Sequence, residues 1–451
     1  MNNIKNIKKI NAILFLLGMI GIFTGNAFAA PPANDNFASA EQLTGVRVSV
    51  TRSNAEATKE TGEPDHANVP GGKSVWFKWT APFSRMMNIS TNRSTGNFDT
   101  MLHVYIGTNV NSLTSWAYNN NINGTLNRKS MVRFAANAGT TYYFAFDGFG
   151  TASLPAAEGE FVLDLNPGLQ TEGADYDNDG MTDLAFFRPS DGSWNYIETS
   201  TGNTRQRFWG KNGDIPLVTS IYGLGNLGFS VFRPSDRIWY FQPYFGVEAY
   251  LNWGLSDDKP VPAQYGGGGS SPYSVYRPSS GEWFIYYSES LQGYYRFGLP
   301  QDIPVPGQYS PDGVADIAVF RPSDGVWYFM IRQSGNPNLD SFRAVKFGAA
   351  GDKPVPADYD GDGNLDIAVY RPSTGTWWVL RSSDGQAQTF QWGLAEDIPT
   401  TGDYDGDGFF DFAVFRPSNG TWYIHRSSDN SVFIRQFGQI GDIPVTSNYG
   451  K

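Results

Sequence analysis

Asp358 to Val379 reads DYDGDGNLDIAVYRPSTGTWWV, and this stretch decides how the rest of the chain is interpreted. Its first nine residues place aspartates at positions one, three, five and nine and a glycine at position six. Calcium takes about six to eight oxygen ligands, and alternating residues of a tight loop turn their carboxylates to the same side. A strand-like run follows Asp366 and leads to Trp377. The stretch therefore predicts a calcium loop attached to the start of a β-strand.

Residues 168–451 repeat this unit six times, at a spacing of about 45 residues. An R-P-S motif marks each copy, at Arg188, Arg233, Arg277, Arg321, Arg371 and Arg416. A tryptophan follows each motif, and an aromatic–glycine pair and then a D-I-P or D-K-P motif come after it. The repeated arginines are hypothesised to pair with the aspartates of these last motifs.

Each repeat contains four short strand-like runs, which in the fifth repeat are 354–359, 366–371, 376–381 and 387–392. Four antiparallel strands in about 45 residues are typical of one blade of a β-propeller. We therefore predict an all-β chain with a propeller over residues 168–451, of six blades or alternatively seven. The first repeat lacks a leading strand and the last has a spare one at 442–449, so the C-terminal strand is expected to complete the first blade.

Three repeats keep the complete set of acids and are expected to hold about three calcium ions. The predicted carboxylate ligands are Asp175, Asp177, Asp179 and Asp183, then Asp358, Asp360, Asp362 and Asp366, and finally Asp403, Asp405, Asp407 and Asp411. Position seven, which is Met181, Asn364 or Phe409, would add a backbone carbonyl. The fourth repeat keeps only Asp312 and Asp316, and the second and third loops have no acids. A structural role for the ions is favoured over a regulatory one.

These repeats resemble the FG-GAP or VCBS repeats of integrin-α-like propellers, over roughly residues 175–451. The resemblance rests on six copies of the motif set, with a strand rather than a helix after each acidic loop. It implies a propeller in which the loop aspartates bind calcium, and here the acids match at the twelve aspartates named above.

Residues 30–167 contain short alternating runs with almost no helical periodicity, which favours an antiparallel β-sandwich. In the run 74–79 the side chains of Val75, Phe77 and Trp79 share one face, which is expected to be the core. The segments GEPDHA (62–67), PGGKSVWFKWTAP (70–82) and AGTTYYFAFDG (138–148) resemble the bacterial pre-peptidase C-terminal domain. That resemblance implies a jelly-roll domain that serves binding or secretion.

The chain begins with three lysines, an apolar run and small residues before Ala29, so residues 1–29 are predicted to be a signal peptide. Its removal moves the formal net charge from −11 to about −14. This negative net charge argues against a nucleic-acid partner. No apolar run later in the chain is long enough to span a membrane as a helix. The chain contains no cysteine, so a secreted or cell-surface protein of this kind must rely on packing or metal for its stability.

No catalytic residue is predicted, and the protein is expected not to be an enzyme. His66, His103 and His425 are far apart in the sequence, which favours structural or surface roles. We expect an adhesion or binding module whose partner is a glycan or an extracellular protein. The alternatives are a secreted polysaccharide-active enzyme and a purely structural surface module. A cluster of aromatics in repeats two and three could form a ligand platform: Tyr244, Phe245, Tyr286, Tyr287, Tyr294 and Tyr295.

Overall fold

Among the described residues, nearly all regular structure is β-strand, as the sequence predicts. The computed structural model describes residues 30–446, except for 46, 83–84, 92–93, 95–97, 121–127, 168–173, 178, 220–227, 244–247, 266–272, 289, 312–313 and 333–339. The only helical turns in this part are 3-10 turns at Phe37–Ser39 and Val110–Ser112. The predicted signal peptide lies outside the described residues. Within them, no helix has both the length and the apolar character that a membrane crossing requires.

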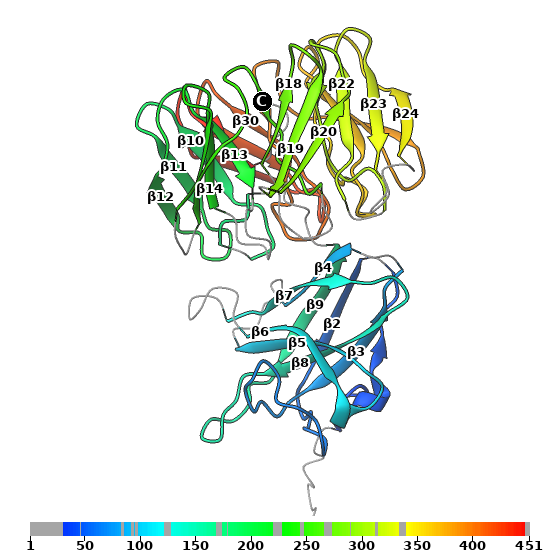
Figure 1. Ribbon diagram of the computed structural model, residues 1–451. Coiled ribbons are helices and arrows are strands. Elements are labelled where there is room, and N and C mark those ends of the chain that lie inside the picture. Colours follow the sequence, from blue (N-terminus) through cyan, green and yellow to red (C-terminus); the bar gives the residue numbers. More distant parts are fainter. Residues whose placement is uncertain are drawn as a thin grey trace, which may run out of the picture. The chain divides into compact units, whose positions relative to one another are not determined.

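Residues 41–167 form two sheets (Figure 1). The five-stranded sheet has the order β1 (Glu41–Gln42), β3 (Val75–Thr80), β8 (Thr141–Gly148), β5 (Thr100–Ile106) and β6 (Thr114–Asn119). The four-stranded sheet has the order β2 (Val48–Ser53), β9 (Glu160–Pro167), β4 (Arg85–Ser90) and β7 (Met131–Ala136). All pairs are antiparallel except β1 with β3. One apolar cluster contains residues of both sheets, so the sheets pack face to face.

Strand β3, which lies between β1 and β8, has buried side chains on both of its faces. Val75, Phe77 and Trp79 lie in the cluster that the two sheets share, as predicted. Trp76 points the other way and is also fully buried, because Phe37 packs against its ring edge-on at 5.2 Å between ring centroids. The N-terminal 3-10 turn therefore covers a face for which the sequence alone gave no expectation of burial.

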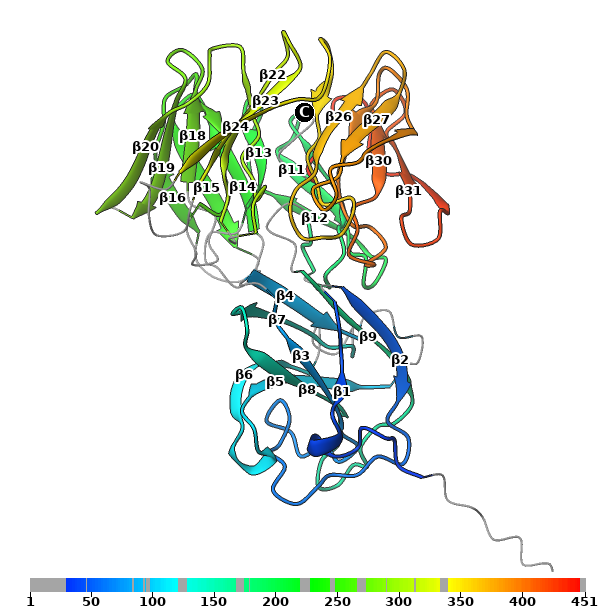
Figure 2. The same cartoon turned by 90° about the vertical axis from the view of Figure 1, so that its right-hand side faces the viewer.

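In the part of the repeats that the structure describes, the strands form six four-stranded antiparallel sheets, one for each R-P-S motif (Figures 1 and 2). The first sheet consists of β33 (Ile443–Pro444), β10 (Leu184–Arg188), β11 (Ser193–Ile197) and β12 (Thr204–Phe208), and the second of β13 (Ile215–Thr219), β14 (Gly228–Arg233), β15 (Ile238–Pro243) and β16 (Ala249–Asn252). The third consists of β17 (Lys259–Pro260), β18 (Tyr273–Arg277), β19 (Glu282–Ser288) and β20 (Leu291–Arg296), and the fourth of β21 (Ile303–Pro304), β22 (Ile317–Arg321), β23 (Val326–Ile331) and β24 (Ser341–Lys346). The fifth consists of β25 (Lys353–Pro354), β26 (Ile367–Arg371), β27 (Thr376–Leu380) and β28 (Ala387–Gln391), and the sixth of β29 (Ile398–Pro399), β30 (Phe412–Arg416), β31 (Thr421–His425) and β32 (Val432–Gln436).

A separate apolar cluster joins each of these sheets to the next. Residues of the first and second sheets share one cluster, and the same holds for every later pair. Leu184 of β10 packs with Ala413 and Trp422 of the sixth sheet, so the last sheet also meets the first. Propellers bury their sheet faces in this way, since each sheet is covered by its two neighbours.

The C-terminal strand completes the first sheet, which confirms the sequence prediction. In β33, Ile443 and Pro444 pair with Phe187 and Phe186 of β10. Val445 follows in a fully buried position and donates its N–H to the Ala185 carbonyl at 2.8 Å. The two ends of the repeat region are therefore held in one sheet.

The repeated tryptophans explain the aromatic–glycine pairs. Each indole N–H donates to the backbone carbonyl of the aromatic residue that precedes the glycine, at 2.7 to 3.0 Å in all six sheets. In the fifth sheet the bond runs from Trp377 to Trp392, and Gly393 then adopts a φ of +115°, which strongly favours glycine. Each tryptophan thus fills the core and also fixes the end of the fourth strand.

The R-P-S arginines pair with the D-I-P or D-K-P aspartates, which confirms the hypothesis. Both Nε and Nη2 donate to the two carboxylate oxygens at 2.7 to 2.9 Å in every sheet. The pairs are Arg188–Asp442, Arg233–Asp214, Arg277–Asp258, Arg321–Asp302, Arg371–Asp352 and Arg416–Asp397. Two-pronged pairing of this kind is specific to arginine, because its planar fork matches a carboxylate.

Breaking one of these pairs is expected to be costly. Asp302 is fully buried, so Arg321→Gln would leave a buried carboxylate without its counter-charge. We expect the free energy of unfolding to fall by about 3 kcal/mol or more, measured by urea denaturation. Arg343→Gln, at an exposed position of the same sheet, is the control and should change it by less than about 0.5 kcal/mol. Equal effects of the two substitutions would contradict a special role for the pair.

Candidate metal centre

Three acidic loops lead into β10, β26 and β30, the strands that follow positions one to nine of each loop. In the fifth and sixth repeats the residue before position one is bridged to position nine, as Ala357 to Asp366 and Gly402 to Asp411. In the first repeat the Asp183 N–H donates to the Ala174 carbonyl at 2.6 Å. Each loop is therefore closed at its base, and its acids are held within one tight turn.

The carboxylates of each loop converge. Three acids in every loop have oxygen atoms that all lie within 4.8 Å of one another. The groups are Asp175, Asp177 and Asp183 in the first repeat, Asp358, Asp360 and Asp362 in the fifth, and Asp403, Asp405 and Asp411 in the sixth. Each group could hold a metal ion, and oxygen-only ligands suit a hard cation.

Glycine at position six lets the backbone turn toward the acid at position one. Gly180, Gly363 and Gly408 have φ values of +90°, +92° and +89°, in the left-handed region. Each donates its N–H to the aspartate at position one, at 3.0, 2.8 and 2.8 Å. This left-handed backbone explains why glycine occupies position six in all three loops.

Position seven also has a defined contact. Met181, Asn364 and Phe409 donate their N–H groups to the aspartate at position five, at 2.8, 2.7 and 2.9 Å. This orients the position-five carboxylate within the loop. The expected use of the position-seven carbonyl as a metal ligand stays a prediction.

The aspartate at position nine ties the loop to the hairpin beyond it. One oxygen accepts the N–H of the tyrosine at position two, as Tyr359 to Asp366 at 2.9 Å. The other accepts a backbone N–H from the turn that follows the second strand after the loop, as Ser382 to Asp366 at 2.7 Å. Position nine therefore fixes the loop to its own sheet through both oxygens.

A pair of hydroxyl residues completes each loop, and the sequence analysis missed it. The pairs are Thr199–Ser200, Ser382–Ser383 and Ser427–Ser428. The second hydroxyl of each pair donates to the aspartate at position three, at 2.5 to 2.6 Å. The sequence does contain a signal for these pairs. At 16 and 17 residues after position nine, two hydroxyl residues occur side by side in the three repeats with complete loops and not in the other repeats. Serine and threonine carry no charge, so the spacing of the acids gives no indication of them.

Burial and mutual repulsion make the acids hard to ionise together. Burial, with the charge of Asp175, raises the pKa of Asp177 to about 6. Burial, with the charge of Asp360, raises the pKa of Asp366 to about 8, and burial with Asp405 raises that of Asp411 to about 7. A bound cation would relieve this repulsion, so the donor set fits a divalent metal.

Two arginines partly balance the charge of the loops. Arg133 and Arg47 donate to the first acids, Asp175 and Asp358, at 2.8 and 2.9 Å. One guanidinium beside three or four carboxylates still leaves each of these loops with a negative excess. The arginines therefore do not replace a divalent cation in the charge balance.

The fourth repeat shows what a loop without the full acid set keeps. Asp316 still accepts the N–H groups of Tyr309 and Arg332, at 3.1 and 2.8 Å. Gln308 and Ser310 occupy positions one and three, and Asp312 lies outside the described residues. The backbone contacts of the position-nine aspartate thus form without acids at positions one and three, so they do not depend on those two carboxylates.

His66 and His103 are distant in sequence but lie close together in residues 30–167. The Tyr105 hydroxyl lies 2.9 Å from Nδ1 of His66 and 2.8 Å from Nδ1 of His103. Nδ1 of His103 also accepts the Ala67 N–H, so it carries no proton and Nε2–H must donate to Ser115. His103 therefore cannot act as a base toward Ser115, and the arrangement suits a structural role.

The buried His103 predicts a loss of local stability in acid. Burial lowers the pKa of His103 to about 3, and the charge of His66 acts in the same direction. Unfolded histidine titrates near 6.5, so its stabilising effect is complete above pH ~6.5 and is lost progressively as the pH falls toward ~3. Hydrogen exchange of β5 and β8 should accelerate over this range by about tenfold per pH unit relative to His103→Asn, which keeps the acceptor but does not titrate. Parallel pH profiles for the two proteins would contradict this.

No family model and no curated protein matches the chain. Several solved structures of β-propeller proteins are similar to it at low identity. A streptogramin B lyase is 8% identical with a TM-score of 0.37, covering 56% of this chain and 83% of its own. An inactive variant of virginiamycin B lyase from Staphylococcus aureus with quinupristin is 9% identical with a TM-score of 0.38, covering 63% and 94%. AztD from Citrobacter koseri is 8% identical with a TM-score of 0.33, covering 77% and 96%.

These similarities correct one expectation. The prediction that the protein is not an enzyme, which rested on the lack of a recognised catalytic residue, is contradicted, because the similar structures include streptogramin B and virginiamycin B lyases. At 8 to 9% identity they assign no reaction to this chain.

Proposed function

We propose that the protein is an exported, calcium-stabilised six-bladed β-propeller with an N-terminal β-sandwich, and that it binds a carbohydrate or an extracellular protein. The observation that carries the calcium assignment is the convergence of three carboxylates in each of three loops. The continuous packing of six sheets, with the sixth meeting the first, supports six blades. The FG-GAP or VCBS character of the repeats and the pre-peptidase C-terminal character of residues 30–167 are part of this proposal.

The ions are proposed to act as structural clips. Position nine already joins each loop to its sheet, and the acids at positions one, three and five lie beside it. Asp358 to Asp366 and the two equivalent loops would hold Ca²⁺ through their carboxylates. When bound, the ion supplies positive charge that lets all these acids ionise within a buried turn.

The aromatic platform predicted in repeats two and three has fewer exposed members than the sequence suggested. Tyr244 and Phe245 lie outside the described residues, and Tyr287 and Tyr295 pack against the core of the third sheet. Instead, one exposed aromatic lies on the outermost strand of each of the first four sheets. They are Phe208 (67% exposed), Tyr250 (56%), Tyr294 (58%) and Phe342 (71%).

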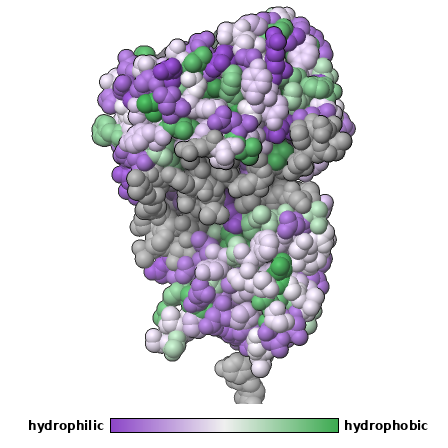
Figure 3. All heavy atoms as spheres, in the orientation of Figure 1, coloured by the Kyte–Doolittle hydropathy of each residue, from purple (hydrophilic) through white to green (hydrophobic). Residues whose placement is uncertain are grey.

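Exposed aromatic side chains of this kind support carbohydrate binding, because sugar rings stack on aromatic rings. The hydroxyl group of a tyrosine can remain in contact with water when its ring is covered in this way. Figure 3 shows polar and apolar residues interspersed over the face drawn there. A partner that uses dispersed aromatic contacts with polar groups between them matches this surface better than one that needs a continuous apolar patch.

A glycan array probed with the purified mature protein in calcium tests the binding proposal. We expect selective binding that weakens when Phe208, Tyr250 and Tyr294 are replaced together by alanine. Tyr118→Ala, at an exposed aromatic of β6, is the control and should leave binding unchanged. If no glycan on the array is bound, the proposal of a carbohydrate partner is wrong. A pull-down of extracellular proteins would then test the proposal of a protein partner.

A further inference from the structure

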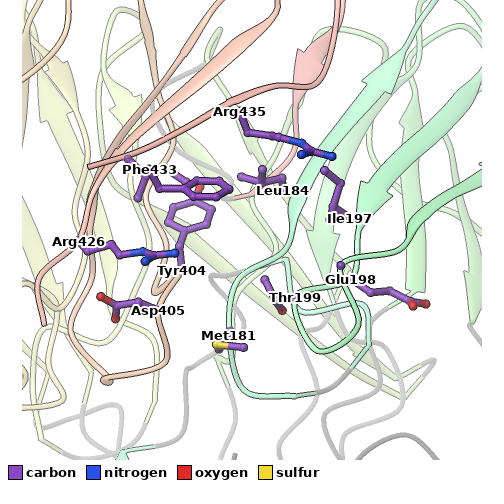
Figure 4. A pocket seen from close by; sticks show the side chains of 12 residues that line it. Met181, Leu184, Ile197, Glu198, Thr199, Tyr404, Asp405, Arg426, Phe433 and Arg435 are labelled. Atoms are coloured by element: carbon purple, nitrogen blue, oxygen red, sulfur yellow. The ribbon is translucent and has the colours of Figure 1, made fainter. Parts of the chain in front are cut away.

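A pocket of about 390 Å³ lies where the sixth sheet meets the first (Figure 4). Leu184 and Ile197 line it from β10 and β11, and Ile424 and Phe433 line it from β31 and β32. Its volume falls within the roughly 300 to 1,000 Å³ of ordinary ligand pockets. It involves neither the exposed aromatics nor the glycan surface proposed above.

The floor of the pocket is apolar. Leu184 and Ile424 are only 5% and 1% exposed, and both belong to the cluster that joins the two sheets. The Tyr404 hydroxyl donates to the Thr400 carbonyl at 3.0 Å, so its ring faces the pocket as an apolar surface. A ligand seated here would lie against hydrocarbon and aromatic rings.

Two arginines bring positive charge to this apolar space. Arg426 lies beside Tyr404, and Arg435 extends toward Ile197 (Figure 4). The Arg426 guanidinium packs over the Phe433 ring, 5.3 Å from its centroid. Its Nε is buried and has no hydrogen-bond partner among the residues that the structure describes. A buried donor without a partner is costly, so a ligand acceptor at this point would be favourable.

The acids of the pocket are already engaged. The Glu198 carboxylate accepts two bonds from Arg205, at 2.9 and 3.1 Å, and one from Thr201 at 2.8 Å. Asp405 accepts from Ser428 at 2.6 Å and is one of the proposed calcium ligands. Neither acid forms an ion pair with Arg426 or Arg435 within the described part of the chain.

We propose that this pocket binds a small organic carboxylate with an apolar body. The carboxylate would accept from Arg426, with Arg435 adding charge at the rim, and the body would pack on Leu184, Ile424 and Phe433. Arginine suits this task, because its fork matches a carboxylate and its flat face stacks on an aromatic ring. A neutral amide of the same shape could still accept from the Arg426 Nε–H but would not balance the guanidinium charge, so a carboxylate should bind more tightly.

Titration calorimetry of the full mature protein with benzoate tests this proposal, with benzamide and acetate as comparison ligands. Benzamide keeps the ring without the charge, and acetate keeps the charge without the ring. We expect benzoate to bind at least about tenfold more tightly than either. Equal binding of benzamide, or no benzoate binding at millimolar concentration, would overturn the proposal.

Arg426→Gln should weaken benzoate binding at least about tenfold without changing the melting temperature, because Arg426 forms no ion pair within the described residues. Arg343→Gln is the matched control, since Arg343 also packs over a phenylalanine ring, 5.8 Å from the centroid of Phe329, but lies outside the pocket. If both variants bind benzoate like the parent protein, the assignment of the carboxylate to Arg426 is wrong.

Discussion

Removing calcium is expected to lower the melting temperature of the protein by roughly 13 °C. Three sites at a hundredfold excess of calcium over their dissociation constants contribute about 8 kcal/mol of stability. A repeat region of about 280 residues has an unfolding entropy near 0.6 kcal/mol/K, which converts that energy into the stated shift. Differential scanning calorimetry with calcium and then with excess chelator measures it. The shift should reverse when calcium is restored.

Substitutions can separate the individual loops. Asp360→Asn with Asp405→Asn disables two of the three loops, and the amide oxygen can still accept from Ser383 and Ser428. This double variant should show about two thirds of the chelator effect, and chelator should then remove only the remaining third. Asp257→Asn with Asp384→Asn, at exposed positions, makes the same change in net charge and serves as the control. A full chelator response in the first double variant would refute the ligand assignment.

Deleting residues 442–451 is expected to lower the melting temperature by about 8 °C and to cause self-association. The deletion removes Ile443 and Val445 from the packing of the first sheet and breaks the Arg188–Asp442 pair, for a loss of about 5 kcal/mol. It also exposes the edge of β10, and unpaired strand edges promote association. Calorimetry and size-exclusion chromatography measure the two effects.

Asp442→Asn is the comparison for the deletion. It weakens the ion pair but keeps β33 paired with β10, so it should lower the melting temperature less and leave the protein monodisperse or in its parental oligomeric state. A deleted protein with parental stability and size would contradict closure of the first sheet by the C-terminal strand.

Much of the repeat fold was predictable because the same residues recur at fixed offsets. The tryptophans and the aromatic–glycine pairs mark the ends of strands through a bond between them, such as Trp377 to Trp392. The strands β1 and β6 were not predicted. β1 has only two residues, and the alternating aromatics of β6, Trp116 and Tyr118, are exposed rather than part of a core. The burial of Trp76 was not predicted for another reason, since the 3-10 turn at Phe37, which is distant in sequence, covers that face of the strand.

The candidate metal loops were predictable from the spacing of their acids, because aspartates at alternate positions of a tight loop bring their carboxylates together as possible metal ligands. The hydroxyl pairs such as Ser382–Ser383 come from the next hairpin and gain meaning only through their bonds to Asp360 and Asp366. The Arg426 pocket could not be predicted, since Leu184 and Ile424 belong to the first and last sheets and meet only when the sheets are assembled.

Calcium content, measured by elemental analysis after dialysis against buffer with trace calcium, tests the central claim most directly. We predict three tightly held ions per chain in the mature protein, falling to one in the Asp360→Asn and Asp405→Asn double variant. The account would be contradicted if the parent protein retained no calcium and its melting temperature did not change when calcium was added.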